Sequence, residues 1–141
     1  MPSNHPFLSS SSIAIFGVSP RRQTMGGAIY DKLKEQGFKA IAIHPDGGNE
    51  WFPNLDSVPD EIGGVCIATK KASSRSIVDV VIKKGIKRVW LQNGAFDQEL
   101  LTKCHDAGLE TYTGCLMMYI PNAGFIHGFH RFLHELIKGK P

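Results

Sequence analysis

The residues best suited to chemistry stand in one short loop, the stretch Gly17–Gly27, which reads GVSPRRQTMGG. Its adjacent arginines, Arg21 and Arg22, can form forked hydrogen bonds to phosphate oxygens, and the Ser19 hydroxyl can donate another. A helical pattern follows, and a helix N-terminus offers unpaired N–H groups and a partial positive charge to an anion. The loop therefore predicts a phosphate-binding site, with a solvent-facing role as the open alternative for each arginine.

The same loop argues against a standard dinucleotide site. Such a site has the fingerprint GxGxxG and an acidic residue about 20 positions later, at the end of the second strand, for the ribose hydroxyls. Here the loop is longer and keeps only Gly17 near the expected place, and the second apolar run ends in His44-Pro45. Asp46 follows that proline, which is a poor position for a ribose contact. We therefore disfavour NAD as the ligand.

Short apolar runs alternate with helical patterns along the chain. The predicted strands cover 13–16, 39–45, 64–68, 88–92 and 110–113, and the helical patterns cover 27–37, 73–85 and 97–108. Runs that are apolar throughout indicate parallel strands covered on both faces. We predict a single domain over residues 1–141 with an α/β fold: a Rossmann-like, doubly wound parallel sheet of about five strands with helices on both faces. Ser73 or Ser74 is the expected N-cap of the second helix.

Three segments follow this alternation less closely. We expect residues 1–12 to be flexible. We expect residues 46–63 to hold at most a short edge strand near Trp51–Phe52 and one helical turn near Pro59–Ile62. The segment 125–140 has the periodicity of a closing amphipathic helix, which we predict as the C-terminal helix of the domain.

Length and composition limit the function classes. With 141 residues, 42% hydrophobic and 21% charged, the chain has the composition of one globular domain. A net charge of +3 is too small to indicate a general nucleic-acid surface, and no apolar run approaches the roughly 18 to 20 residues of a membrane span. The three cysteines form no CxxC pair, and the N-terminus has no secretory pattern, so we expect a cytoplasmic protein.

Three longer stretches carry a resemblance to a known family. They are IAIFGVSPRRQTMGGAIYDKLKEQGFKAIAIHP, VPDEIGGVCIAT and KRVWLQNGAFDQELLTKCHDAGLETYTGCLMMY, between about Ile13 and Tyr119. Their order and spacing resemble the small stand-alone CoA-binding proteins, which are similar to the CoA-binding domain of the succinyl-CoA synthetase alpha subunit. The resemblance implies a Rossmann-like fold that holds coenzyme A, or an acyl-CoA, along the carboxyl ends of its strands.

The resemblance also implies which residues meet the ligand. The first loop would hold the phosphates and ribose, and the turn after the second strand would lie beside it. The end of the third strand would flank the adenine or pantetheine, and the end of the fourth would close the next loop. In the same order, these positions are Gly17, Val18, Ser19, Pro20, Arg21, Arg22, Met25 and Gly26; His44 and Pro45; Ala68, Thr69, Lys70 and Lys71; and Gln92, Asn93 and Gly94. The chain departs from many relatives at His44, where they have Asn, and at Thr69–Lys71, where they often have a proline-containing turn.

The resemblance implies binding without catalysis, because the synthetase's second domain, with its phosphorylated histidine, has no counterpart in this sequence. No catalytic residue is expected. Two other functions stay open, namely an NAD(P)- or nucleotide-dependent oxidoreductase and a regulatory protein whose ligand site has decayed. The expected partner is the small molecule CoA, with neither nucleic acid nor a membrane.

The geometry of a parallel sheet adds one expectation about these loops. The carboxyl ends of all its strands face the same edge, so the four implied loops should line one cleft although they are far apart in sequence. We expect the second strand to pair on the far side of the first. The switch point, where the strand order reverses, then lies between the strands at 13–16 and 64–68.

Two further groups of residues could in principle do chemistry. His127, His130 and His134 fall near one face of the tail helix, but only Glu135 could complete a ligand set, so we predict no metal site. Cys115 follows the fifth strand. Packing as a small buried residue is favoured for it over a role as a reactive thiol.

Overall fold

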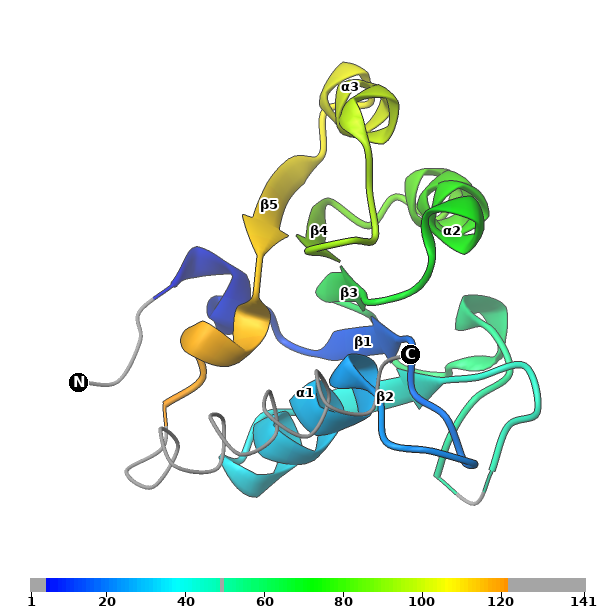
Figure 1. Ribbon diagram of the computed structural model, residues 1–141, viewed down its shortest axis with the longest axis vertical. Helices are drawn as coiled ribbons and strands as arrows, with labels where there is room; N and C mark the ends of the chain where they lie inside the picture. Colours follow the sequence, from blue (N-terminus) through cyan, green and yellow to red (C-terminus); the bar gives the residue numbers. More distant parts are fainter. Residues whose placement is uncertain (1–4, 49, 122–141) are drawn as a thin grey trace, which may run out of the picture.

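The computed structural model describes residues 5–48 and 50–121. Within them five strands form one sheet, in the order β2-β1-β3-β4-β5, and every neighbouring pair is parallel. The strands are β1 (Ile13–Phe16), β2 (Ala40–Ile43), β3 (Gly64–Ile67), β4 (Arg88–Gln92) and β5 (Glu110–Gly114), and the α-helices are α1 (Met25–Glu35), α2 (Lys71–Lys83) and α3 (Gln98–Asp106). The predicted fold class, a Rossmann-like α/β fold with a parallel sheet of five strands, is confirmed (Figure 1).

The central strands are buried on both faces, which explains why their sequences are apolar throughout. Successive side chains of a strand point to opposite faces of a sheet. In β1, Ile13 and Ile15 accordingly pack into one core layer and Ala14 packs into the other. In β4, Trp90 is 1% exposed and belongs to the first layer, whereas its neighbour Leu91 belongs to the second.

The helices cover both faces of the sheet, as the sequence predicted. Helix α1 lies on one face, and α2 and α3 lie on the other (Figure 1). Ile29 and Leu33 of α1 belong to the first core layer, and so does Leu116 of the short 3-10 helix η3 (Leu116–Met118). Val78 of α2 and Leu100 of α3 belong to the second layer.

The strand order reverses beside β1. Strand β1 pairs with β2 on one side and with β3 on the other, so the chain runs outward in both directions from the centre of the sheet. This confirms the predicted switch point between β1 and β3. In doubly wound sheets, ligands bind outside the carboxyl ends of the strands at such a point, because the loops diverge there and leave a crevice.

Helix α2 begins earlier than the sequence predicted. The predicted N-cap was Ser73 or Ser74, but the helix starts at Lys71 and its N-cap residue, Lys70, makes no side-chain cap hydrogen bond. Ser74 is completely buried, and its hydroxyl donates to the backbone oxygen of Lys70 at 3.1 Å. A serine that bonds to the carbonyl four residues earlier satisfies its hydroxyl inside a helix, so serine alone did not mark the start.

The irregular segments also differ from the predictions. Residues 1–12 were given no element, but η1 (Pro6–Ser9) forms there and Phe7 is completely buried. The edge strand expected near Trp51–Phe52 is reduced to a single bridge between Phe52 and Ile43 of β2. The helical turn expected at Pro59–Ile62 occurs earlier, as the 3-10 helix η2 (Leu55–Ser57).

The predicted C-terminal helix at 125–140 lies outside the described residues. Among the helices that the structure does describe, none combines the length and the apolar character needed to cross a bilayer.

Candidate functional site

A cleft of about 610 Å³ opens at the carboxyl edge of the sheet. All four loops that the sequence predicted there contribute to it, after β1, β2, β3 and β4. The lining residues are Gly17, Val18, Ser19, Arg22, Thr24, Met25, His44, Ala68, Thr69, Lys70, Ser73, Gln92, Asn93 and Gly94. We call this cavity the strand-end cleft.

Two glycines bring the first loop close to its neighbours. Gly17 leaves β1 with a φ of 107°, and a Cβ atom there would lie 2.3 Å from the backbone oxygen of Ala68. A Cβ on Gly26, in the first turn of α1, would lie 2.6 Å from the carbonyl carbon of Gly17. Any larger residue at either position would push backbone segments apart, so both glycines are needed for the floor of the cleft.

Thr24 closes the first loop on itself. Its hydroxyl donates to the backbone oxygen of Gly17 at 2.6 Å and accepts from the backbone N–H of Gly27 at 3.0 Å. The residue is therefore the N-cap of α1 and also joins the helix to the end of β1. This side chain holds the loop between 17 and 24 in one shape.

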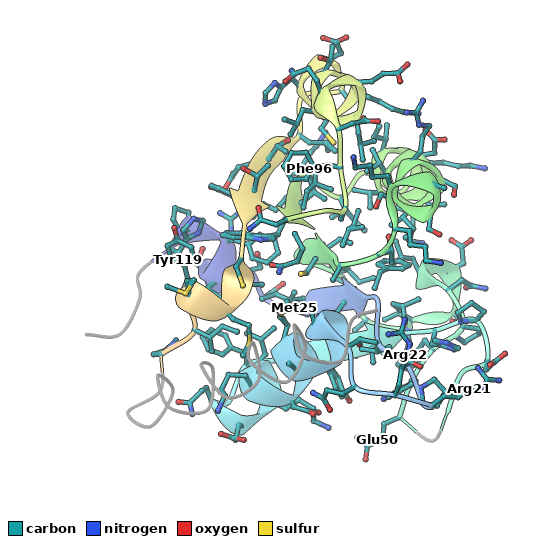
Figure 2. All side chains as sticks on the ribbon, in the orientation of Figure 1. Arg21, Arg22, Met25, Glu50, Phe96 and Tyr119 are labelled. Atoms are coloured by element: carbon teal, nitrogen blue, oxygen red, sulfur yellow. The ribbon has the colours of Figure 1, made fainter. Side chains whose placement is uncertain are left out.

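The two arginines of the first loop differ in their surroundings. Arg21 points away from the cleft, and its guanidinium lies 3.4 Å from the Asp46 carboxylate at the exit of β2. Arg22 lines the cleft, and no ion pair among the described residues uses it. Figure 2 labels both arginines on the first loop. Among the residues that the structure describes, the only other cationic side chain in the lining is Lys70, and no Asp or Glu lines the cleft. The cleft therefore has a positive potential suited to an anion.

The start of α2 adds hydrogen-bond donors to the cleft. Because Lys70 supplies no side-chain cap, the first N–H groups of the helix are not used by its own N-cap residue. The Thr69 hydroxyl lies 3.0 Å from the Ser74 hydroxyl, which fixes the approach to the helix. Ser73, in the first turn, presents an exposed side chain to the cleft.

The ends of β4 and β2 complete the lining. Gln92 is 4% exposed, and its side-chain oxygen accepts from the backbone N–H of Leu116 at 2.6 Å. That bond leaves the amide nitrogen of Gln92 as the group that can donate to a ligand. At the exit of β2, Nδ1 of His44 accepts from the backbone N–H of Asp46 at 3.1 Å. While it does so, the imidazole proton resides on Nε2, which is free to donate.

Most of the predicted site residues line the strand-end cleft, but some do not. Pro20, Arg21, Gly26, Pro45 and Lys71 were predicted and are not in its lining. Gly26 supports the cleft from below through its contact with Gly17, and Pro20 faces a different pocket.

Two lining residues, Thr24 and Ser73, were missed by the sequence analysis. Helix α1 begins at Met25, two residues before the predicted helix at 27–37, and Thr24 is its N-cap. A threonine just before a helical pattern is a recognisable N-cap signal, so Thr24 could have been found. Ser73 was interpreted as a cap instead of a lining residue, because the start of α2 was placed two residues too late.

The other candidate residues have different surroundings. Cys115 is half-buried and packs against the first core layer, and it does not line the cleft. Burial raises the pKa of the Cys66 thiol far above its ordinary value. The described residues contain no cluster of three or more His, Cys, Asp or Glu suited to a metal ion. The three tail histidines lie outside the described residues.

A doubly wound parallel sheet with a cationic cleft at its switch point defines the class of Rossmann-like ligand-binding domains. The family model of the CoA binding domain matches residues 11–121 of this chain. The chain therefore belongs to that family, as the resemblance indicated.

Solved structures share the fold. A hypothetical protein from Pyrococcus horikoshii OT3 is 27% identical, with a TM-score of 0.70 over 78% of this chain and 81% of that chain. The protein called cell-free ID.343 from Thermus thermophilus is 20% identical, with a TM-score of 0.71 over 80% of this chain and 90% of that one. The dinucleotide forming acetyl-coenzyme A synthetase 1 of Ca. Korarchaeum cryptofilum, in complex with phosphate and ADP, is 23% identical, with a TM-score of 0.62. That match covers 72% of this chain but only 25% of the synthetase.

Proposed function

We propose that this protein binds coenzyme A or an acyl-CoA in the strand-end cleft and performs no reaction on it. The observation that carries the proposal is the charge of the lining, in which Arg22 and Lys70 are cationic and none of the described residues is acidic. Coenzyme A bears three phosphate groups, so it gains more from such a cleft than a neutral metabolite does. Membership of the CoA binding domain family supports the same ligand.

The arrangement of donors supports a particular orientation. Arg22, the Ser19 hydroxyl and the first turns of α1 and α2 surround the middle of the cleft, where the phosphates would lie. Gln92 and Asn93 border the cleft at the end of β4, and amide groups there suit the amides of the pantetheine arm. The arm would therefore leave the cleft toward β4.

The lining also supports binding without catalysis. Its described residues offer hydroxyls, amides, one imidazole and the cationic groups of Arg22 and Lys70, but no cysteine and no carboxylate that could act as a nucleophile or as a partner base. Nδ1 of His44 is occupied by the backbone of Asp46. As part of the same proposal we place the protein in the cytoplasm, because Cys66, Cys104 and Cys115 are free thiols, which fits a reducing compartment.

Calorimetric titrations with CoA, acetyl-CoA, NAD and NADP, run side by side, test the proposed function. We expect CoA or acetyl-CoA to bind at micromolar affinity or better and the two nicotinamide nucleotides to bind at least tenfold more weakly. Binding of NAD in the absence of CoA binding would contradict the proposal and favour an oxidoreductase. If none of the four ligands binds, the site has decayed and a regulatory protein is the better assignment.

A further inference from the structure

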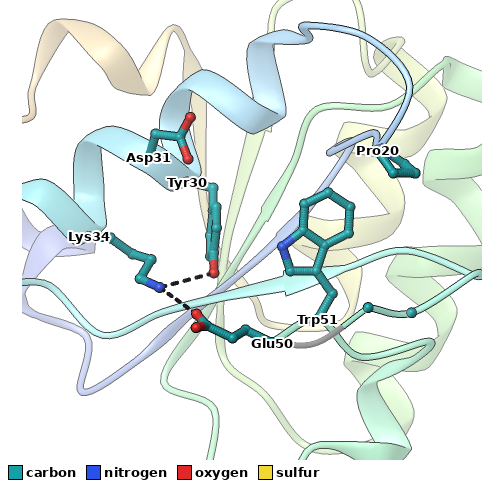
Figure 3. Close-up of a pocket in the computed structure, with 8 residues that line it drawn as sticks. Pro20, Tyr30, Asp31, Lys34, Glu50 and Trp51 are labelled. Atoms are coloured by element: carbon teal, nitrogen blue, oxygen red, sulfur yellow. Dashed lines mark hydrogen bonds and ion pairs between the residues drawn. The ribbon is translucent and has the colours of Figure 1, made fainter.

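A second cavity shares the first loop with the strand-end cleft, because Pro20 lines it. It measures about 650 Å³ and is lined by Pro20, Tyr30, Asp31, Lys34, Gly47, Gly48, Glu50 and Trp51 (Figure 3). We call it the aromatic pocket. Its elements are α1 and the segment after β2, so it lies at the β2 side of the sheet. Nothing in the proposed phosphate site uses these side chains.

We propose that the aromatic pocket holds the adenine base of the same CoA molecule whose phosphates lie in the strand-end cleft, with the ring stacked on Trp51. This assignment rests on the proposed function and names where one end of the ligand binds.

The two cavities are separated by one short stretch of chain. Ser19 and Arg22 line the strand-end cleft, whereas Pro20, between them, lines the aromatic pocket. His44 of the cleft also contacts Trp51 of the pocket, with ring centroids 6.2 Å apart. A nucleotide that has its phosphates beside Arg22 therefore needs to pass only over Pro20 for its base to reach Trp51.

The walls of the pocket suit a flat heterocycle. The Trp51 ring is half-buried and stands nearly perpendicular to the Tyr30 ring, at 85° with centroids 6.5 Å apart. Gly47 and Gly48 line the pocket without side chains, and a Cβ atom on Gly48 would lie 3.5 Å from Cγ of Trp51, so a larger residue there would crowd the indole. An aromatic base can stack on such a face whatever its hydrogen-bonding pattern.

The charges of the pocket favour a base over a phosphate. Lys34 donates to Glu50 at 2.8 Å and to the Tyr30 hydroxyl at 3.4 Å, so the lysine and Glu50 satisfy each other. No ion pair of the described residues uses Asp31, and its burial, aided by Glu35, raises the pKa of this carboxyl. The exocyclic amino group of adenine can donate a hydrogen bond to a carboxyl oxygen of Asp31, whereas the negative charge of this carboxylate would repel a phosphate.

The position of the pocket also agrees with the direction of the ligand. The pantetheine arm is proposed to leave toward Gln92 of β4, and the sheet order places β2 and β4 on opposite sides of β1. The base then belongs on the β2 side, where the aromatic pocket lies. The strand-end cleft thus suits the phosphates of the nucleotide, and the neighbouring aromatic pocket suits its base.

Tryptophan emission tests this assignment on the intact chain. The sequence has two tryptophans, and Trp90 is 1% exposed, so Trp51 is the one that a ligand can reach. We expect both CoA and adenosine to quench the emission, and pantetheine to leave it unchanged. Quenching by pantetheine but not by adenosine would overturn the proposal, because the pocket would then hold the other end of the ligand.

Calorimetry on variants gives the second measurement. Trp51→Ala should weaken CoA binding about tenfold or more, because base stacking is lost, and Trp51→Phe should retain affinity within about threefold. Asp31→Asn should weaken binding several-fold, because the carboxylate that accepts from the base is lost, and it should not lower stability, because partial burial disfavours the charged form of Asp31 in the folded protein. Tyr119→Ala is the matched control: its exposed ring lines neither cavity, and its affinity should stay unchanged.

The outcomes separate the two proposals. If wild-type protein gives no heat with CoA, the proposed function fails, and the base assignment fails with it. If wild-type protein binds CoA and Trp51→Ala binds it equally well, the proposed function stands and the base assignment alone is overturned. Asp31→Asn keeps the second outcome measurable if Trp51→Ala does not fold.

Discussion

At the scale of single residues, Arg21 and Arg22 give the sharpest comparison in this protein. We expect Arg22→Ala to weaken CoA binding about tenfold or more, because a hydrogen bond to a charged group contributes roughly 1.5 to 3 kcal/mol. We expect Arg21→Ala to change affinity less than threefold, because its guanidinium faces Asp46 and is 77% exposed. The two variants remove the same charge from adjacent positions, so each is the control for the other. Calorimetry that gave the opposite order would contradict the assignment of Arg22 to the phosphates.

Dephospho-CoA extends this comparison. An equal loss for CoA and dephospho-CoA in Arg22→Ala would assign Arg22 to the diphosphate, which both ligands carry. A smaller loss for dephospho-CoA would assign it to the 3′-phosphate.

The arginine pair also marks a limit of the sequence. Residue types and their place after a strand were enough to predict a phosphate loop at 17–26. They were not enough to choose between the arginines, because that choice depends on Asp46, which is 25 positions away and meets Arg21 only in the folded chain. Pro20 was predicted as a ligand contact because it lies between Ser19 and Arg21 in the sequence. Its side chain instead lines the aromatic pocket.

At the scale of elements, the junction between β1 and α1 depends on Thr24. Thr24→Val removes the N-cap bond to Gly27 and the bond to the Gly17 oxygen, so we expect the free energy of unfolding to fall by about 1 to 2 kcal/mol. CoA affinity should fall as well, because the first loop loses its fixed shape. Urea unfolding and calorimetry measure the two effects.

A second helix cap provides the control for this prediction. The Asp97 side chain accepts from the N–H of Leu100 at 2.9 Å and caps α3, and it does not line the cleft. Asp97→Ala should therefore lower stability by about 1 kcal/mol and leave CoA affinity unchanged. Thr24→Ser, which keeps the hydroxyl, should retain both properties. Equal CoA affinity in Thr24→Val and in wild type would show that the first loop keeps its binding conformation without the hydrogen bonds of the Thr24 hydroxyl.

The N-terminal 3-10 helix gives a pH-dependent prediction. His5 packs against Trp90, Tyr112 and Tyr119, and burial lowers the pKa of its imidazole, against a smaller opposing effect of Glu110. Since the folded pKa lies below the unfolded value of about 6.5, the stabilisation is complete above pH 6.5 and is lost as the pH falls below it.

Denaturant unfolding between pH 5 and 7.5 measures this effect. The free energy of unfolding should fall less steeply with decreasing pH in His5→Asn, which keeps a cap acceptor for Phe7 but does not titrate. An identical slope in the variant and in wild type would show that His5 is not the group responsible.

Elements were predicted unevenly, and the reasons are physical. Strand β4 has the predicted bounds, and α3 lies within the predicted range 97–108 with Asp97 as its N-cap, because an apolar run and an acidic cap are local signals. The start of α2 has no side-chain cap, so no local signal marked it. The N-terminal segment was predicted to be flexible because it is rich in serine. Phe7 is nevertheless completely buried and packs against Trp90 of β4, a contact between residues far apart in the sequence.

At the scale of the whole molecule, the sheet order explains why four distant loops form one site. The order β2-β1-β3-β4-β5 and the parallel direction of every pair place those loops at one edge. The alternation of strands and helices predicted the parallel direction, and of the order only the place of β2 on the far side of β1 was expected. The division of that edge into a cationic cleft and an aromatic pocket did not follow from the alternation. It depends on the irregular segment after β2, in which Trp51 has no periodic pattern around it.

Hydrogen exchange with and without CoA can test whether this edge is the site. At a ligand concentration of about 100 Kd, amides that exchange only when the ligand leaves should slow by about 100-fold. We expect that protection in the segments 17–26, 68–74 and 92–95, which carry the lining of the strand-end cleft. The segments 60–63 and 85–87 lie at the opposite edge, where β3 and β4 begin, and should exchange as before by local opening. Protection confined to that opposite edge would contradict the site, the orientation of the ligand and the proposed role of Arg22 together, because no side chain of the cleft reaches there.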